Sequence, residues 1–461
     1  MAKKNEITDA VYDATALGTS KMMVLGLQHM FAMFGATVLV PALTGLNVST
    51  TLLFAGLGTL LFHLITGMKV PAFLGSSFAF LGGYAAIAPM LPDANGVASV
   101  ANTAMLPYAC FGVACAGLVY LVLAAFFKGF GAKKVMRYFP PIVTGPIIIC
   151  IGLSLAGSAI NNCRTNWLVA VAAILIVVAA NVWGKGMVKI VPILLGVIGS
   201  YVFAMIVDPA ARAKVAATVA EAKWFGLPII WENTALSIFG KDLDASLLIN
   251  SVITIMPIAL ATIVEHIGDM CAISSTVGKN YVADPGLHRT LVGDGLATTV
   301  ASLFGAPANT TYGENTGVLA LSKVYDPKVI RLAALFAMVL SFCPKFAALI
   351  VAMPAATMGG VSLVLYGMIS GVGVRNVVEN QVDFTKSRNV LVAAMIMGLA
   401  VGVSYNGAIN IPVGSATISL SGLAVAALVG IFMNAVLPGK DYEFGTNARG
   451  DSAVDFGSAA K

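Results

Sequence analysis

The sequence predicts an all-α integral membrane protein that crosses the bilayer about 14 times. Hydrophobic residues make up 58% of its 461 residues, and charged residues make up only 10%. Stretches without any charged residue are long, as from Met22 to Met68 and from Asn389 to Gly439. One helix needs roughly 20 apolar residues to cross a bilayer, so such stretches hold more than one crossing. This composition argues against a soluble globular protein.

Breaks at proline, glycine and charged clusters divide the apolar sequence into spans. The expected span centres lie near residues 33, 58, 80, 116, 149, 175, 198, 258, 297, 315, 340, 363, 396 and 424. The third and tenth spans have the least helical sequences, because proline, glycine and small polar residues interrupt them. We expect both of these spans to be broken helices that line a cavity, where irregular backbone is tolerated.

Two polar tails and one long polar loop set the expected domain boundaries. Residues 1–20 and 439–461 form the tails, and residues 208–244 form the longest hydrophilic loop. The loop separates seven spans in 21–207 from seven spans in 245–438. With an even number of spans both tails share one side, and 21 of the 27 basic residues fall on that side. Both termini are therefore expected in the cytoplasm, and the long loop outside.

Polar residues recur at matching places in the two sets of spans. Gln28-His29 in the first span is matched by Glu265-His266 in the eighth span, 237 residues later. The same offset takes Ser77 in the third span to Glu314 in the tenth. Two sets of seven spans would have opposite orientations, which is the 7+7 inverted repeat of many secondary transporters. Interrupted spans in corresponding places point to the binding site of such a transporter.

Four acidic residues lie in or beside the predicted spans, namely Glu265, Asp269, Asp294 and Glu314. A low-dielectric interior disfavours the charged carboxylate, so each must carry a proton or meet a polar partner. Acidic residues inside a membrane are functional by default. Glu265 and Asp269 are four residues apart and so share one helix face. For Asp269 and Asp294, a position at the membrane interface or at a helix end is an equally good interpretation.

The depth of Glu265 depends on where the eighth span begins. If the span began at Ala245, Glu265 would lie about 30 Å along the helix, near the inner boundary of the bilayer. We therefore expect the span to begin nearer Ser251. Among the other candidates, His29 fits an interior hydrogen bond and a substrate contact equally well, whereas Tyr366 is more typical of packing.

These motifs resemble those of the nucleobase–ascorbate transporters, also called the nucleobase:cation symporter-2 family, and within it most resemble bacterial uracil permeases. The family signature is an acidic or amide residue, Asn-x-Gly, four residues, and Thr before a basic residue. Here it extends from Glu314 to Lys323, with Ser322 in place of the threonine. Three further motifs of the family match Gln28-His29, Ser76-Ser77-Phe78 and Glu265-His266.

The resemblance implies a proton-coupled symporter that imports uracil across the cytoplasmic (inner) membrane. It implies a core domain of spans 1–4 and 8–11 and a gate domain of spans 5–7 and 12–14. Spans three and ten would contain short strands, the core would move against the gate, and the gate would form a homodimer. Glu314 favours uracil, because xanthine-type members have Gln there. A carrier of xanthine or another purine nucleobase on the same fold is the alternative.

The resemblance also implies roles for individual residues. Glu265 and Glu314 would accept hydrogen bonds from the uracil ring, and backbone N–H groups of Phe78 and Gly313 would add contacts. Glu265 would carry the proton, and Asp269 replaces a histidine of some uracil permeases, so it either substitutes in proton coupling or the relay differs. The expected substrate-binding residues are Glu265, Glu314, Phe78, Gly313, Tyr312, His29 and Tyr366.

Other classes of function have weaker support. The sequence has no His-Glu-x-x-His or Gly-x-Ser-x-Gly pattern for an embedded hydrolase, so we expect no enzyme and no cofactor or metal. The six cysteines are scattered and form no CxxC pair. The net charge of +6 follows the topology and does not indicate nucleic-acid binding. An ion channel or anion exchanger is the remaining class, and the acids at the site argue against anions.

Overall fold

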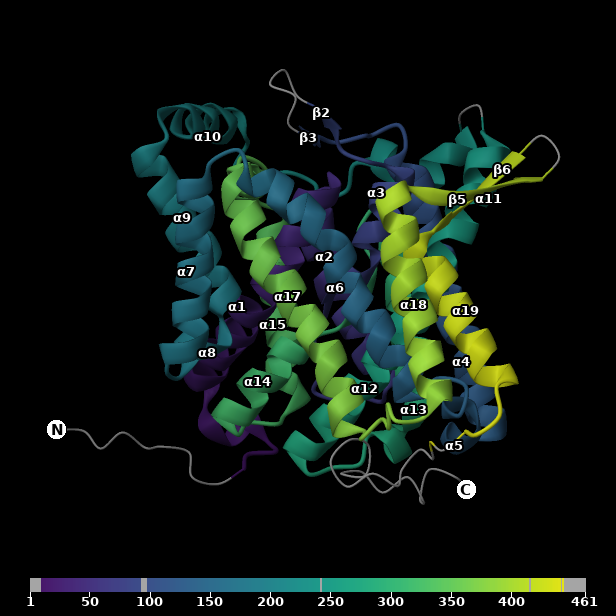
Figure 1. Ribbon diagram of the computed structural model, residues 1–461. Helices are drawn as coiled ribbons and strands as arrows, with labels where there is room; N and C mark the ends of the chain where they lie inside the picture. Colours follow the sequence, from purple (N-terminus) through teal and green to yellow (C-terminus); the bar gives the residue numbers. More distant parts are fainter. Residues whose placement is uncertain (1–9, 93–97, 241–242, 414–415, 441, 443–461) are drawn as a thin grey trace.

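The computed structural model describes residues 10–92, 98–240, 243–413, 416–440 and 442, so most of the expected tail 439–461 lies outside it. Long helices run side by side between two ends of the molecule (Figure 1). The start of α1 (Thr19–Thr44) and the end of α19 (Gly422–Val436) lie at one of these ends, which we call the terminal end.

The elements alternate between long helices and short connections. The first part contains η1 Ala14–Leu17, α1 Thr19–Thr44, α2 Val48–Ile65, β1 Leu74–Ser76, η2 Phe78–Phe80, α3 Leu81–Ile87, β2 Leu91–Pro92, β3 Ala98–Val100, α4 Leu106–Phe130, α5 Ala132–Met136, α6 Pro141–Cys163, α7 Trp167–Trp183, α8 Met187–Ile190, α9 Pro192–Val207 and α10 Pro209–Glu221. The second part contains η3 Trp231–Asn233, η4 Ala235–Gly240, α11 Ala245–Ile255, η5 Met256–Ile258, α12 Ala259–Val277, η6 Val282–Gly286, α13 Leu287–Leu303, β4 Asn309–Thr311, α14 Gly313–Ser322, α15 Pro327–Ser341, α16 Pro344–Val351, α17 Ala355–Glu379, α18 Ser387–Asn406, β5 Ala408–Val413, β6 Ala416–Ser421 and α19 Gly422–Val436.

The described helices are those of a multi-pass membrane protein. Seven helical segments are long and apolar enough to cross a bilayer, or nine if each of two bent helix pairs counts as one span. Three shorter apolar helices accompany them, including α7 and α19. Each expected span centre falls within a described element, from α1 for residue 33 to α19 for residue 424. The prediction of a helical multi-pass membrane protein is confirmed.

Both segments that we expected to be broken are interrupted by a strand. Strand β1 pairs antiparallel with β4, with Gly75 opposite Thr310 at the centre. The pairing extends by one hydrogen bond on each side, because Ser77 N–H donates to Ala308 O and Tyr312 N–H donates to Phe73 O. A helix follows each strand after one residue, η2 and then α3 after the first and α14 after the second.

A local two-fold axis relates these two strands. The axis relates residue 73 to residue 308 and residue 77 to residue 312, an offset of 235 in both cases. It therefore interchanges the two flanking hydrogen bonds. The same offset relates Phe78 to Gly313, the first residues of the helices that follow. At this point the offset is two residues shorter than the 237 of the sequence motifs. Ser77 therefore corresponds to Tyr312 and not to Glu314, because backbone pairing, and not polar residue type, sets the equivalence.

The helix that contains Glu265 is broken near its middle. Helix α11 begins at Ala245, since Asp244 Oδ1 accepts a hydrogen bond from Leu247 N–H. Pro257 lies in the short turn η5, and α12 continues from Ala259. Our expectation of a start nearer Ser251 is wrong, because the cap at residue 244 fixes the beginning of the helix.

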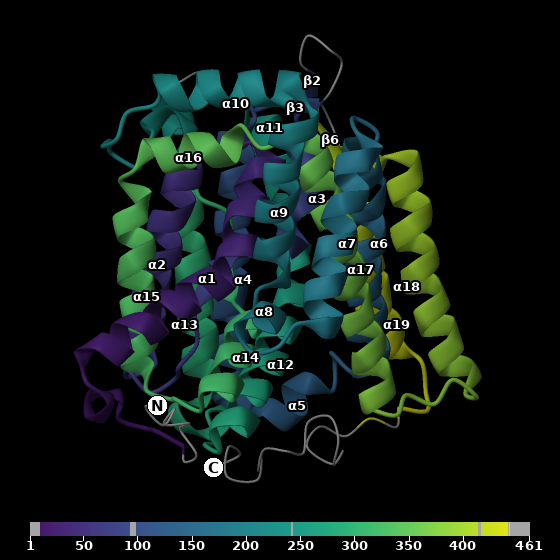
Figure 2. The same cartoon turned by 90° about the vertical axis from the view of Figure 1, so that its left-hand side faces the viewer.

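Two helices lie across the end opposite to the terminal end (Figure 2). Helix α10 bends by 112° from α9, and α16 bends by 85° from α15. The predicted loop 208–244 therefore contains a helix, which begins because Asp208 accepts hydrogen bonds from the N–H groups of Ala210 and Ala211. Trp224, which follows α10, is 67% exposed and suits a membrane interface.

Helix packing divides into two groups. Helices α6, α7, α9, α17, α18 and α19 pack with one another, most extensively α17 along α6. Helices α1, α2, α4, α11, α13 and α15 form the second group, with α13 along α4 and α15 along α2. Strands β1 and β4 and helices α12 and α14 contact this second group, which therefore holds both broken segments.

Candidate functional site

The broken segments bring two helix beginnings and α12 together. The helices that start at Phe78 and Gly313 have no side-chain cap, so their first backbone N–H groups are available to a ligand. A Cβ atom on Gly313 would lie 3.4 Å from Asp269 Oδ1, which places the start of α14 directly against α12. Two expected site residues, Gly313 and Asp269, are thus neighbours.

Glu265 and Glu314 are exposed although they lie among buried residues. On α12 the exposed residues are Glu265, Gly268, Ala272 and Ser275, and on α14 they are Gly313, Glu314, Gly317, Ala320 and Leu321. Their spacing of three or four residues puts each set on one helix face. Both sets run from the acidic residue to the C-terminal end of the helix, at the terminal end of the molecule (Figure 1).

On the side of Glu265 away from the terminal end, the neighbouring residues are buried. Ala259 and residues 261–264 are buried, and so are β1 and β4. The exposed residues that continue from the two carboxylates along their helices therefore lie towards the terminal end. We call the two exposed faces the α12 stripe and the α14 stripe.

Behind these stripes, Asp269, Thr311 and His266 form a hydrogen-bonded chain into the interior, and Asp294 lies against its inner end. Thr311 Oγ1 donates to Asp269 Oδ2 over 3.1 Å and lies 3.2 Å from His266 Nδ1. His266 Nδ1 also lies 3.3 Å from Asp294 Oδ2. Because Thr311 gives its only hydrogen to Asp269, the Nδ1 atom of a neutral His266 carries the proton and donates it. Asp294, at the inner end of the chain, is buried like His266.

Two further expected site residues support the broken segments from inside. Tyr312 O–H donates to Ser76 O over 2.8 Å and accepts from Thr37 Oγ1 at 3.1 Å. Asn315 Nδ2 donates to His29 O over 3.0 Å and lies 3.2 Å from His29 Nδ1. Both Tyr312 and His29 are buried, so they hold the segments in place behind the accessible carboxylates.

The remaining expected residues lie in different surroundings. Phe78 is half-buried at the start of η2. Tyr366 is buried in α17, the helix that packs along α6, and therefore belongs to the other packing group. Within the described residues, Tyr366 makes no hydrogen bond or ring contact with Glu265, Asp269 or Glu314.

Asp294 corrects one sequence interpretation. It lies in the middle of α13 and is completely buried, so neither interfacial solvation nor helix capping accounts for it. His266 and Thr311 are members of the site that sequence reasoning did not assign. The pair Glu265-His266 was a signal for the histidine, but Thr311, 45 residues later in the chain, had none.

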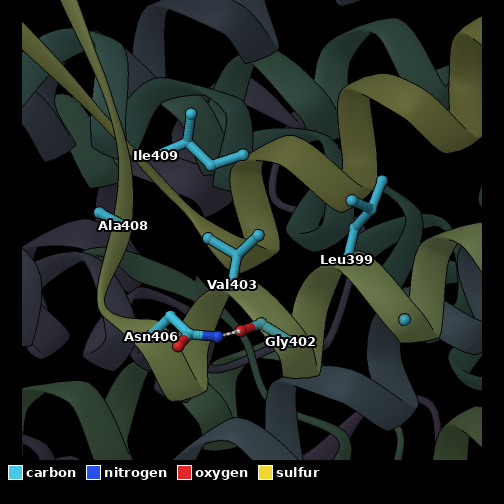
Figure 3. Close-up of a pocket in the computed structure, with 7 residues that line it drawn as sticks. Leu399, Gly402, Val403, Asn406, Ala408 and Ile409 are labelled. Carbon is cyan, nitrogen blue, oxygen red and sulfur yellow. Dashed lines mark hydrogen bonds between the residues drawn. The ribbon is translucent and has the colours of Figure 1, made fainter.

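A surface hollow lies elsewhere in the molecule. It is lined by α18 and the start of β5, with Leu399, Val403 and Ile409 around it (Figure 3). Asn406 Nδ2 closes one side by donating to Gly402 O over 2.8 Å. None of the expected site residues lines this hollow. Within the described part of the chain, no group of three or more His, Cys, Asp or Glu side chains could hold a metal ion.

Comparison with known proteins identifies the family. The model of a permease family, that of the nucleobase–ascorbate transporters, matches residues 20–409. The chain belongs to this family. The uracil permease of Bacillus caldolyticus is 40% identical over 427 residues, which cover 91% of this permease and 92% of the relative. The uracil permease of Escherichia coli strain K12 is 37% identical over 426 residues, which cover 89% and 90%. The permease is thus a transporter and not an enzyme.

Solved structures share the fold of the permease. The transmembrane domain of the cyanobacterial bicarbonate transporter BicA matches with a TM-score of 0.53 and 14% identity, covering 92% of this permease and 98% of that chain. The structure of SLC26A9 matches with a TM-score of 0.62 and 13% identity, covering 92% and 66%. At such identities the likeness shows the fold alone.

Proposed function

We propose that this permease imports uracil together with a proton. The observation that carries the proposal is the juxtaposition of two accessible carboxylates, Glu265 and Glu314, with the uncapped helix starts at Phe78 and Gly313. Uracil has two ring N–H donors and two carbonyl acceptors. The carboxylates suit the donors, and the backbone N–H groups suit the acceptors. Identity of 40% to a uracil permease supports the same substrate.

The roles of the site residues follow from their positions. Glu265 and Glu314 accept the N–H groups of uracil, and the N–H groups of Phe78 and Gly313 donate to its carbonyls. Tyr312 and His29 act from behind, since they fix Ser76 and Asn315. Tyr366 lies on α17, in the other packing group. It would contact the substrate only when α17 approaches the carboxylates during the transport cycle.

Proton coupling uses Glu265 and Asp269. A proton that enters along the α12 stripe reaches Asp269. The hydrogen bonds of the buried chain behind Asp269 can then reverse their donor-to-acceptor direction. In this direction His266 is the neutral tautomer with its proton on Nε2. Asp269 donates to Thr311, Thr311 donates to the free Nδ1 atom, and the imidazolium so formed passes the Nδ1 proton to the Asp294 carboxylate. One proton enters at Asp269 and one arrives at Asp294, and His266 ends neutral. The distances of 3.1, 3.2 and 3.3 Å support this path.

Transport proceeds by alternating access in a 14-span, 7+7 inverted repeat. The core comprises spans 1–4 and 8–11 and the gate comprises spans 5–7 and 12–14, with repeats at 21–207 and 245–438. The two packing groups of helices and the local two-fold axis between β1 and β4 support this division. Both termini are cytoplasmic in the inner membrane, and the gate forms a homodimer. The terminal end is then cytoplasmic, and the site is open inward.

Uptake by site variants tests the assignment. Glu265→Gln and Glu314→Ala are expected to abolish uptake of labelled uracil while the protein still reaches the membrane, as measured by immunoblot of membrane fractions. His63→Gln is the control, because His63 is a polar residue inside a helix whose side chain contacts Ala72 O, away from the carboxylates. Wild-type uptake in either site variant would remove that residue from the site.

A further inference from the structure

The chain segment before α1 lies against the ends of the two helices that carry the site carboxylates. Val11 N–H donates to Lys323 O over 2.9 Å, and Tyr325 N–H donates to Val11 O over 2.8 Å. Val11 thereby pairs with Val324 as an isolated parallel bridge. These contacts hold the C-terminal end of α14, because Lys323 is the residue that caps this helix.

Tyr12 reaches from the same place to the end of α12. Its O–H donates to Val277 O over 2.7 Å, and Val277 is the last residue of α12. Its ring lies 5.5 Å from the ring of Tyr325, and Lys279 Nζ lies 4.6 Å from its centroid. Tyr12 therefore touches the end of α12 on one side and the turn after α14 on the other.

The rest of the segment is fixed to α15 and α1. Ala14 N–H donates to Asp326 Oδ2 over 2.8 Å, and Asp326 also caps α15 by accepting from Lys328 N–H. Ala14, Leu25, Val324 and Val329 form a small buried cluster of their own. A buried hydrogen bond and a buried apolar cluster therefore both hold the segment in place.

The two helices need an external support at this end. Helix α14 has only 10 residues, and helices of that length are marginal without tertiary contacts. Glu314 lies about 14 Å from Lys323 along α14, and Glu265 lies about 18 Å from Val277 along α12. A change of angle between the two helix ends at the terminal end therefore moves the two carboxylates relative to each other.

We propose that residues Val11–Leu17 are a clamp that fixes the terminal ends of α12 and α14 and thereby positions Glu265 and Glu314 for uracil. Val11 and Tyr12 are its positioning residues. The inference rests on the proposed function for the ligand, but the clamp itself concerns only the two helices. Because its hydrogen bonds and its apolar cluster join it to α1, α12, α14 and α15, it travels with the site when the groups move.

A distance measurement tests the clamp without any substrate. Spin labels go on Ser275→Cys in the α12 stripe and Ala320→Cys in the α14 stripe, after replacement of the six native cysteines. Adding Tyr12→Ala is expected to broaden the distance distribution between the labels, whereas Tyr138→Ala, an exposed tyrosine that follows α5, leaves it unchanged. An unchanged distribution in Tyr12→Ala would overturn the clamp.

Kinetics then separate positioning from general damage. Loss of one well-placed hydrogen bond is worth about 1 kcal/mol, so Tyr12→Ala is expected to raise the KM for uracil about fivefold with little change in maximal rate. Tyr12→Phe removes the same hydroxyl but keeps the ring, and is expected to raise the KM by a similar factor, because it loses the hydrogen bond to Val277 O. A fall in maximal rate with unchanged KM contradicts positioning. If wild-type protein neither binds nor carries uracil, the proposed function fails, and the label distances still decide the clamp.

A cross-link tests whether the clamp stays closed during transport. This experiment does not need the Tyr12→Ala variant, so it remains possible if that variant does not fold. Val11→Cys with Val324→Cys joins two bridge partners in the cysteine-free background. Oxidised protein is expected to transport uracil at the rate of the reduced protein, because the clamp moves with the helices that it joins. Transport that is lost on oxidation and recovered with a reductant would show a segment that must open, and the clamp would be wrong.

Discussion

His266 Nδ1 and Asp294 Oδ2 lie 3.3 Å apart, and neither side chain has any exposure to solvent. Removing one partner of a buried polar pair leaves the other without compensation and costs about 1–3 kcal/mol, whereas exposed ion pairs contribute about 0–1 kcal/mol. The pair therefore fixes α12 against α13 directly behind the carboxylates. The importance of the pair for folding can be measured separately from its proposed part in proton transfer.

Asp294→Ala is expected to lower the stability of the purified protein far more than a surface change does. We expect a loss of about 1–3 kcal/mol, seen as a fall in the midpoint of thermal unfolding in detergent. Lys69→Ala is the matched control, because its pair with Asp284 is half-exposed or more on both sides. Equal midpoints for the two variants would mean that the His266–Asp294 pair does not hold the interior together.

Gly75→Ala is expected to disrupt the pairing of the two broken segments. A Cβ atom there would lie 2.6 Å from the ring of Tyr312 and 2.8 Å from Thr37 Oγ1. The ring cannot move away without losing its hydrogen bond to Ser76 O, so we expect a loss of about 1–3 kcal/mol and of uracil uptake. Gly82→Ala in α3 is the control, because its Cβ meets nothing within 4 Å. Normal uptake by Gly75→Ala contradicts the tight contact.

Cysteines on the α12 stripe are expected to react from the cytoplasmic side. Ser275→Cys should be modified by a membrane-impermeant thiol reagent in inside-out vesicles, because Ser275 is exposed at the terminal end of α12. Ser251→Cys should stay unmodified, since Ser251 is buried. Modification of Ser275→Cys from the outside only would reverse the proposed orientation or the open side of the site.

The clamp is expected to hold without change between pH 5 and pH 8. Hydrogen bonds from Thr15, with help from Lys328, lower the pKa of Asp13 from 3.8 to about 2. A lowered pKa means that the stabilising contacts of this carboxylate are present above its ordinary pKa and are lost only as the pH falls towards 2. The Ser275–Ala320 label distance should therefore be the same at both pH values. A distance change over this range would indicate another titrating group in the clamp.

The sequence was sufficient for features that depend on local composition. Charge-free apolar runs located the elements from α1 to α19, and proline, glycine and small polar residues marked both broken segments. It was insufficient for features that depend on contacts between distant residues. The pairing of Gly75 with Thr310 and of Val11 with Val324 joins residues more than 200 positions apart, and no periodic signal records it. The link between Thr311 and His266 was not predictable either, because it depends on how β4 packs on α12.

Uptake of labelled uracil by cells without a uracil transporter of their own, with and without a protonophore, tests the central claim most directly. Proton-coupled uracil import predicts that the protonophore abolishes uptake. It also predicts that unlabelled uracil, but not unlabelled xanthine, inhibits uptake of the labelled uracil. Uracil uptake that is insensitive to the protonophore would contradict proton coupling. No uptake, with the protein confirmed in the membrane, would contradict uracil as the substrate.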